Sequence, residues 1–187
     1  MTASGYPVAS GEPAPASAPP VPARRDAALA AAGWVAILAP VLALLLKLPS
    51  FGWFMVVIIW SSPLWILGYV LLVVAVSLGM LRRRASLREP RSRRTRSIVW
   101  AWLTSAGVVL LGLALVDGGD TSESVQSTLT MLLGVPGGSS GANDASMVVA
   151  GVGALAWIVG YVALVVEWLA ALAKRQAEAP RVAPPVV

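Results

Sequence analysis

Long apolar stretches alternate with short polar ones along the chain, and this pattern predicts four membrane-spanning helices. The apolar stretches lie at residues 27–48, 63–81, 98–116 and 146–173. A helix needs about 20 predominantly apolar residues to cross the hydrocarbon core of a bilayer, because it rises about 1.5 Å per residue. The expected fold class is therefore all-α: a polytopic membrane protein with a four-helix transmembrane bundle.

The first span, 27–48, holds two residues that are unusual in a membrane helix. Pro40 lacks an amide hydrogen and crowds the preceding turn, so it should kink the helix. Lys47 lies at the far end, where we expect its side chain to snorkel and place the ammonium group at the membrane interface. The alternative interpretation of Lys47 is a charge in a pore or substrate path.

A separate apolar segment, 51–62, precedes the second span. Ser62 as a helix cap and Pro63 as the first helical residue favour a new helix start there. One continuous helix from Phe54 would be about 28 residues or roughly 42 Å long, which exceeds the hydrocarbon core. We therefore predict a short interfacial segment at 51–62 and a second span at 63–81.

The second and fourth spans share a ten-residue sequence, WILGYVLLVV at 65–74 and WIVGYVALVV at 157–166. Eight of the ten positions are identical at an offset of 92 residues. Apolar matches between membrane segments arise easily, but Trp, Gly and Tyr in register do not. A self-match at a fixed offset indicates an internal duplication. We predict that the bundle is built from two parallel two-helix repeats, 24–81 and 98–175.

The duplicated positions form one helical face on each copy, with the spacing i, i+3, i+4 and i+7. Two spans per unit give both copies the same orientation. We predict that the second and fourth spans pack centrally, with the glycines permitting close approach and each tyrosine hydroxyl bonding across the contact. The alternative is a pocket there for a lipid or other hydrophobic ligand. The residues of this face are Trp65, Gly68, Tyr69, Leu72, Trp157, Gly160, Tyr161 and Leu164.

The segment between the repeats, residues 82–97, is strongly basic. Short loops rich in arginine stay in the cytoplasm, so thirteen basic residues lie inside and only Lys47 outside, and both termini are expected to be cytoplasmic. Arginines beside a membrane attract anionic lipid headgroups. Nucleic acid is not expected as a partner, because nothing in the loop can stack on bases. The predicted lipid contacts are Arg82, Arg83, Arg84, Arg88, Arg91, Arg93, Arg94 and Arg96.

The remaining polar regions are two tails and one long loop. Residues 1–23 and 176–187 are rich in Pro and Ala, so we expect disordered cytoplasmic tails. In the outer loop, 117–145, Asp120 and Glu123 resemble a helix-capping pair and predict a short amphipathic helix on the outer surface. The acids of this loop lack the dense spacing of a calcium loop, so no metal site is predicted.

Glu167 is the only acidic residue of the fourth span, and it precedes Lys174 by seven residues. This spacing places it roughly 10 Å inside the basic edge. An ionisable residue within a span suggests a protonatable or cation-coordinating carboxylate. The alternative is an interfacial ion pair, or a hydrogen bond to Trp168 or Thr104. The duplication does not require the acid, because its counterpart in the first repeat is Ala75.

Composition agrees with a membrane protein and narrows the possible chemistry. The chain is 57% hydrophobic and 12% charged, which is too apolar for an ordinary soluble domain. Because it contains no Cys and no His, disulfides, thiolate nucleophiles, most zinc sites and Ser-His pairs are excluded, and no cofactor is expected. Twelve arginines against two lysines indicate a high-GC bacterial source, of the actinobacterial kind, and hence a bacterial plasma membrane.

Three classes of function then compete: an accessory or scaffold protein, a small transporter or channel, and an enzyme. No nucleophile has a base beside it and no phosphate loop occurs, so we expect no enzyme and no catalytic residues. A transporter, possible as a homo-oligomer, needs polar residues near the midplane, where the sequence offers Ser77, Thr104 and Ser105. We therefore predict an accessory or scaffold subunit that binds another membrane protein, or itself, through its helices and arginine-rich loop.

Overall fold

The computed structural model describes residues 27–82 and 91–178, and within these ranges the chain is helical apart from turns and an isolated β-bridge between Asp117 and Gln126. Four of the described helical segments are long and apolar enough to cross a membrane, which confirms the predicted all-α class and the number of candidate spans in the described part of the chain. The elements in chain order are α1 (Ala27–Lys47), η1 (Leu48–Ser50), α2 (Trp53–Trp60), α3 (Ser62–Val76), the π-helical η2 (Ser77–Leu81), α5 (Arg91–Ala114), η3 (Ser122–Ser124), α6 (Thr128–Leu132) and α7 (Ser140–Glu178).

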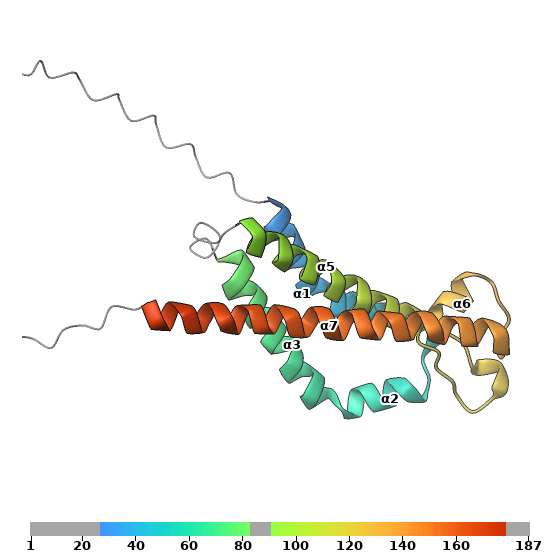
Figure 1. Cartoon of the computed structure of the whole chain (residues 1–187). Coiled ribbons are helices and arrows are strands. Elements are labelled where there is room, and N and C mark those ends of the chain that lie inside the picture. The colour runs from blue at the N-terminus through green and yellow to red at the C-terminus, as the bar shows by residue number, and fades with distance from the viewer. Residues whose placement is uncertain (1–26, 83–90, 179–187) are drawn as a thin grey trace, which may run out of the picture.

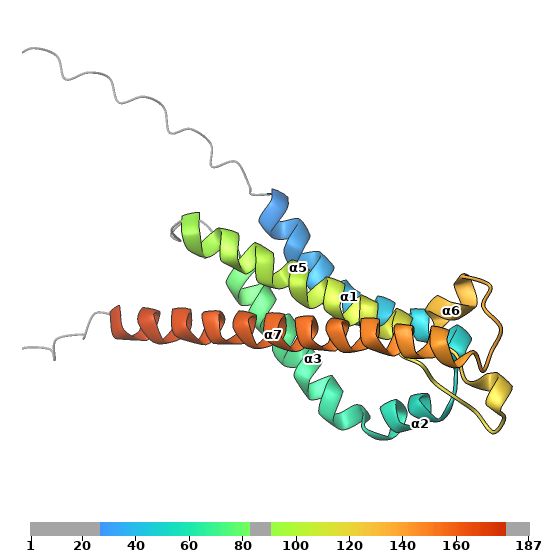
Figure 2. The same cartoon turned by 45° about the vertical axis from the view of Figure 1, so that its right-hand side comes forward.

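Helices α1, α5 and α7 lie side by side and form the centre of the molecule (Figure 1, Figure 2). The contacts of α5 with α7 and with α1 are the most extensive between described elements. Successive spans run in alternating directions, so the start of α5 and the ends of η2 and α7 lie at one end of the bundle. We call this the arginine end, because Arg82, Arg93, Arg96 and Arg175 belong to it. The opposite end, with η1, α6 and the start of α7, is the loop end.

The second span departs from this centre over half of its length. Figures 1 and 2 show α2 leaving the loop end sideways and α3 returning toward the arginine end at an angle to α7. The buried residues of α3 are Leu72, Ala75 and Val76, all in its second half. Residues 53–71, which we call the α2–α3 arm, are therefore mostly exposed, with Met55 as the buried exception within α2.

The segment expected to be separate from the second span does form its own helix. Helix α2 ends at Trp60 and is followed by the cap residue Ser61, whose amide donates to the Val57 carbonyl oxygen at 2.8 Å and whose hydroxyl donates to the Ile58 carbonyl oxygen. The structure places the cap of α3 at Ser61 rather than at Ser62, and Pro63 still lies in the first turn. The break follows from proline, which supplies no amide hydrogen to continue the ladder from α2.

Two helices extend beyond their predicted limits. Helix α5 begins at Arg91, seven residues before the expected start at 98, so part of the predicted basic loop is helical. Arginine is a good helix former, and Arg93 gains a partner on α7 in this conformation. Helix α7 covers Ser140–Glu178 instead of 146–173. Its first turn is supported by Asn143, whose side-chain amide donates to the Val125 carbonyl oxygen at 2.9 Å.

The helix in the long loop is shorter than expected and has a different cap. Asp120 and Glu123 do not cap it, because this region forms only the short η3. Helix α6 instead begins after Ser127, whose hydroxyl accepts from the Thr130 amide at 3.0 Å while the Thr130 hydroxyl accepts from the Ser127 amide. Ser and Thr thus form a reciprocal capping box in place of the acidic pair.

Glycine decides where α5 can approach its neighbours. A Cβ atom on Gly107 would lie 2.4 Å from the Trp157 backbone nitrogen, and one on Gly112 would lie 2.6 Å from the Ala43 carbonyl oxygen. Small residues therefore let the backbones of α5, α7 and α1 touch, which is how helices associate in lipid. Two clusters of buried apolar residues lie along these contacts, one around Leu72 and Leu164 and the other around Val108.

The two predicted repeats differ in shape. In the second, α5 packs along α7, whereas in the first α1 and α3 have few contacts because the arm diverges. The difference follows from the glycines, since Gly107 and Gly153 have their backbone contacts in the α5–α7 pair. The duplication and its parallel-repeat arrangement therefore stay predictions from the sequence.

Candidate functional site: a pocket at the arginine end and a buried ion pair at the loop end

The two Trp-Gly-Tyr segments meet through one tyrosine. The Tyr161 hydroxyl donates to the Gly68 carbonyl oxygen at 3.1 Å and so joins α7 to α3. Its counterpart Tyr69 donates to the Ile37 carbonyl oxygen of α1 at 2.9 Å, within the first hairpin. Leu72 and Leu164 are buried in the same apolar cluster. Hydroxyls that would be costly to leave unpaired in lipid are thus bonded to backbone oxygens.

The glycines and tryptophans of these segments have different surroundings. A Cβ atom on Gly160 would lie 2.6 Å from the Thr104 hydroxyl, so this glycine packs against α5 and not against α3. At Gly68 the nearest atom would be the Tyr161 hydroxyl oxygen at 3.8 Å, which is ordinary contact. Trp157 packs beside Val108 in the core, whereas Trp65 is partly exposed and donates to the Ile58 carbonyl oxygen. The expected central contact between glycines of α3 and α7 is therefore replaced by an α5–α7 contact.

Glu167 is held at the arginine end by three residues of α5. Its Oε1 lies 3.2 Å from Nε of Arg96, and its Oε2 accepts from the Ser97 hydroxyl at 3.0 Å. Arg93 donates to the Glu167 carbonyl oxygen at 2.5 Å. The side chain of Arg96 is 63% exposed, so Glu167 forms a partly exposed ion pair, which agrees with the ion-pair alternative from the sequence. Trp168 and Thr104 do not bond to the carboxylate in these contacts.

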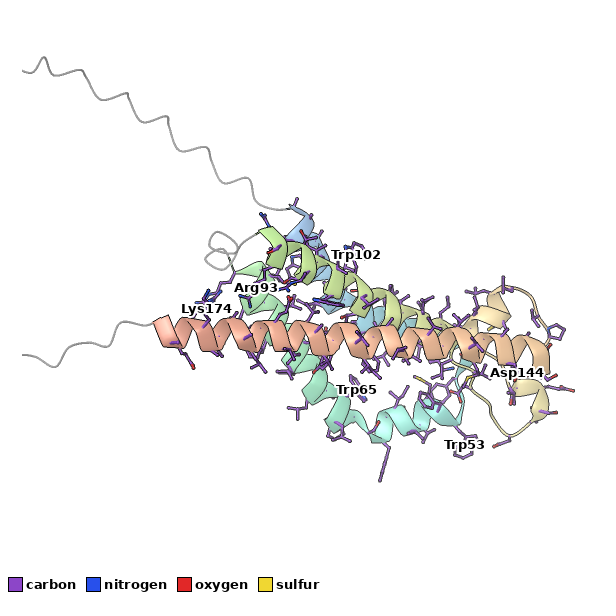
Figure 3. All side chains as sticks on the ribbon, in the orientation of Figure 1. Trp53, Trp65, Arg93, Trp102, Asp144 and Lys174 are labelled. Carbon is purple, nitrogen blue, oxygen red and sulfur yellow. The ribbon has the colours of Figure 1, made fainter. Side chains whose placement is uncertain are left out.

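A pocket of about 150 Å³ lies beside Glu167, between η2, α5 and α7. Its polar lining includes three arginines from three parts of the chain, Arg82, Arg93 and Arg175. Figure 3 shows Arg93 projecting from the first turns of α5 toward the end of α7. Ser97, Glu167 and Trp168 complete the polar rim, and leucines, Met80 and small residues form the rest of the wall.

The arginines predicted as lipid contacts divide into two groups. Arg91, Arg93, Arg94 and Arg96 lie on the first turns of α5, and Arg82 follows η2. Arg83, Arg84 and Arg88 lie outside the described residues. The helical start of α5 spaces Arg93 and Arg96 at i and i+3, which places both toward α7. Arg175, at the end of α7, was not among the predicted contacts but lines the same pocket.

The interpretation of Lys47 as a snorkelling side chain is wrong. Lys47 is only 2% exposed, and its ammonium donates to the Leu115 carbonyl oxygen at 2.7 Å and to the Ser50 hydroxyl at 3.1 Å. Asp117, which is also buried, places Oδ2 at 3.8 Å from the ammonium nitrogen. The side chain turns inward because a carboxylate and two oxygen acceptors are available there, and these replace hydration.

Asp117 connects the buried pair to the α2–α3 arm. Its Oδ1 accepts from the Phe54 and Gly118 amides, each at 2.9 Å, and the Trp53 amide donates to the Gly118 carbonyl oxygen. A Cβ atom on Gly52 would lie 2.6 Å from the same Oδ1, so only glycine permits this approach. The carboxylate thus caps the first turn of α2 and satisfies amide hydrogens that have no partner within the helix.

Buried hydroxyls extend this network across the loop end. Thr128 bonds to the Ser50 hydroxyl and donates to the Leu46 carbonyl oxygen, which joins α6 to α1. Ser146 bonds to the Ser127 hydroxyl at 2.7 Å and donates to the Ala114 carbonyl oxygen, which joins α7 to α6 and α5. The network satisfies backbone oxygens at the ends of α1 and α5 that have no partner within their helices.

Sequence reasoning missed this pair, although a signal existed. Lys47 closes the first span and Asp117 directly follows the third, so both lie at the same predicted membrane level. Opposite charges at the same depth are candidates for pairing. Among the described residues, no group of three or more acids gathers in a way that could hold a metal ion.

Comparison of the chain with protein-family models, with curated proteins and with solved structures finds no match. The fold and the two sites therefore define the class: an all-helical protein with four helices that can span a membrane, a cationic pocket at one end and a buried ion pair at the other.

Proposed function

We propose that the protein is a non-enzymatic accessory or scaffold subunit of a bacterial plasma membrane that binds another membrane component through the α2–α3 arm. We further propose that the arginine end and both termini are cytoplasmic. The gathering of arginines at one end supports this orientation, since basic residues are retained on the cytoplasmic side. The acids lie at the loop end. Asp120 and Glu123 are in the segment between α5 and α7, and Asp144 is near the start of α7 (Figure 3).

The observation that carries the proposal is that the arm is exposed over most of its surface, and around the whole circumference of α3 at its start. Trp60, Leu64 and Leu67 are 88%, 76% and 69% exposed, and every residue from Pro63 to Leu67 is exposed. The second half of α3 buries one face, so the first half is unusual within its own helix. A helix that is apolar all round requires an apolar environment on every side.

The arm is also held in a fixed direction at both ends. Asp117 anchors the start of α2, and Tyr161 anchors Gly68 of α3. These contacts fix the position of the two ends of the arm, while most of the residues between them stay exposed. Presenting a separated apolar helix in a defined position supports recognition of a neighbouring transmembrane helix, which associates by close packing in lipid.

Photochemical cross-linking from the arm tests the proposal. A benzophenone amino acid is introduced at Leu67 in the arm or, as a control, at Trp102, which is 51% exposed on α5 and lies away from the arm (Figure 3). Irradiation in native membranes should give a protein adduct of discrete mass from position 67 and not from position 102. Adducts with lipid alone at position 67, or the same protein adduct from both positions, would contradict the proposal.

The buried ion pair does not favour a transporter. Lys47 is the last residue of α1, and Asp117 follows the end of α5, so the pair lies at the loop end and not near the middle of the spans. Its polar atoms face backbone groups and hydroxyls that join helices. These contacts support a structural role, which fits an accessory protein better than a substrate path.

A further inference from the structure

The pocket at the arginine end combines cationic and apolar walls, and we propose that it binds a single phosphate group, that of an anionic lipid headgroup. The inference does not depend on the proposed role of the arm. It concerns one defined pocket between η2, α5 and α7, in addition to the general attraction of arginines to a membrane surface.

The charge of the pocket favours an anion. Arg82, Arg93 and Arg175 line it together with one acid, Glu167. The Glu167 carboxylate is paired with Arg96, which does not line the pocket, and it accepts a hydrogen bond from Ser97. Three guanidinium groups thus line the pocket against a single acid, and that acid is paired from outside it. Guanidinium groups bind phosphate through charge-assisted and often bidentate hydrogen bonds.

The volume of the pocket and its apolar wall favour a phosphate that belongs to an amphiphilic molecule. A volume of about 150 Å³ corresponds to roughly five water molecules at about 30 Å³ each. This accommodates a phosphate and adjoining glycerol carbons, but not a whole lipid. Leu78, Leu164 and Leu172 line the pocket beside the arginines, and Leu78 and Leu172 are exposed. The acyl chains could therefore leave along apolar side chains while the phosphate stays among the arginines.

The pocket depends on tertiary structure, because its arginines are far apart in the sequence. Arg82 ends the first hairpin, Arg93 begins the third span and Arg175 ends the fourth. Arg93 is itself positioned by its bond to the Glu167 carbonyl oxygen. A site of this kind predicts that individual arginines have unequal importance, whereas a diffuse surface charge predicts equal effects from neighbouring basic residues.

Lipid retention by the purified full-length chain tests this in a neutral detergent. Native mass spectrometry measures binding of phosphatidylglycerol and, at equal concentration, of zwitterionic phosphatidylcholine. We expect phosphatidylglycerol to bind about tenfold more tightly, the ratio that corresponds to one net charge-assisted hydrogen bond. A second experiment adds inorganic phosphate to the lipid-bound protein. Displacement of the lipid by phosphate would identify free phosphate as a second source of the same ligand chemistry, and persistence of the lipid would identify the headgroup.

Two variants separate the pocket from the surface. Arg175→Gln should weaken phosphatidylglycerol binding about tenfold, whereas Lys174→Gln, which removes the adjacent charge outside the pocket lining, should change it less than about twofold. Gly79→Leu fills the pocket without changing the charge and should also weaken binding about tenfold. A Cβ at Gly79 would lie 3.8 Å from Trp168 Cδ1, an ordinary van der Waals distance, and the rest of the leucine side chain would occupy the pocket. Circular dichroism and size-exclusion profiles check that each variant folds.

The proposal is overturned by equal binding of the two lipids. It is also overturned if Lys174→Gln weakens phosphatidylglycerol binding as much as Arg175→Gln does, or if Gly79→Leu folds and binds the lipid like the wild type.

Discussion

At the scale of single residues, Lys47 and Asp117 have the strongest mutual dependence. Both side chains are buried, and each supplies a charge that the other compensates at 3.8 Å. Removing one partner of a buried pair leaves an uncompensated charge, which costs about 3–5 kcal/mol. Replacing both partners costs far less, because no charge then remains to be solvated.

We predict that Lys47→Met lowers the free energy of unfolding by about 3 kcal/mol or more, since Asp117 stays buried without its cation. Titration with sodium dodecyl sulfate in mixed micelles, followed by circular dichroism, measures this. The double variant Lys47→Met with Asp117→Asn should recover at least half of the loss, because asparagine keeps the Oδ1 acceptor used by the Phe54 amide. A single variant as stable as the wild type would show that the pair is not coupled.

The ion pair of Glu167 at the arginine end is partly exposed, unlike the buried pair at the loop end. Its partner Arg96 is 63% exposed, so solvent screens the pair and the expected contribution to stability is small. The hydrogen bond from Ser97 orients the carboxylate within the rim of the pocket. We expect Glu167 to act through the shape and charge of the pocket more than through folding.

At the scale of elements, one glycine contact sets the position of α5 against α7. The hypothetical Cβ of Gly107 meets the Trp157 nitrogen and the Gly153 carbonyl oxygen, and these backbone atoms cannot move independently of α7. Gly107 lies on α5 and Gly153 on α7, so the contact is made by one glycine from each helix and not by a GxxxG motif within one helix. The sequence alone could not identify this contact, because it shows which residues are small and not which helix each of them faces.

Gly107→Ala should therefore separate α5 from α7 and lower the free energy of unfolding by about 2 kcal/mol, within the range found for overpacked sites. The matched control is Gly151→Ala on α7, where a Cβ would meet nothing within 4 Å. The control should be neutral or slightly stabilising, because alanine favours a helix over glycine. The free energy of unfolding is measured for both variants. A similar decrease in the two would contradict a specific α5–α7 contact.

The helix boundaries show where local pattern and tertiary contact compete. Hydropathy located all four spans, but it began the third too late, at residue 98, because the residues before it are basic. Arg93 and Arg96 continue the helix because α7 offers them a carbonyl oxygen and a carboxylate. Likewise Asn143 and Ser146 extend or fix the start of α7 through the loop and α5, which no local rule could anticipate.

At the scale of the whole molecule, the main prediction is its orientation. The chain has no Cys, so single cysteines report on one position each without a cysteine-free background having to be made. Thr121→Cys at the loop end should react with a membrane-impermeant maleimide in intact cells, because the basic segments are kept in the cytoplasm. Both Thr121 and the control position Ser92, on the first turn of α5, are exposed.

Ser92→Cys should be labelled only after the cells are permeabilised. Labelling in the reverse order would place the arginine end outside and remove the basis for the proposed orientation. Equal labelling of both positions in intact cells would contradict a membrane-spanning arrangement between them.

The sequence by itself determined the class, the four spans and the clustering of arginines, because hydropathy and charge act over windows of residues whatever the neighbours are. Only the tertiary structure decided that Lys47 turns inward to Asp117, that Gly160 packs on α5, and that Arg82, Arg93 and Arg175 line one pocket. These outcomes depend on which helices touch and at what angle. Several pairings of four apolar helices bury similar area, and backbone approach at glycines with hydrogen bonds to carbonyl oxygens selects one of them.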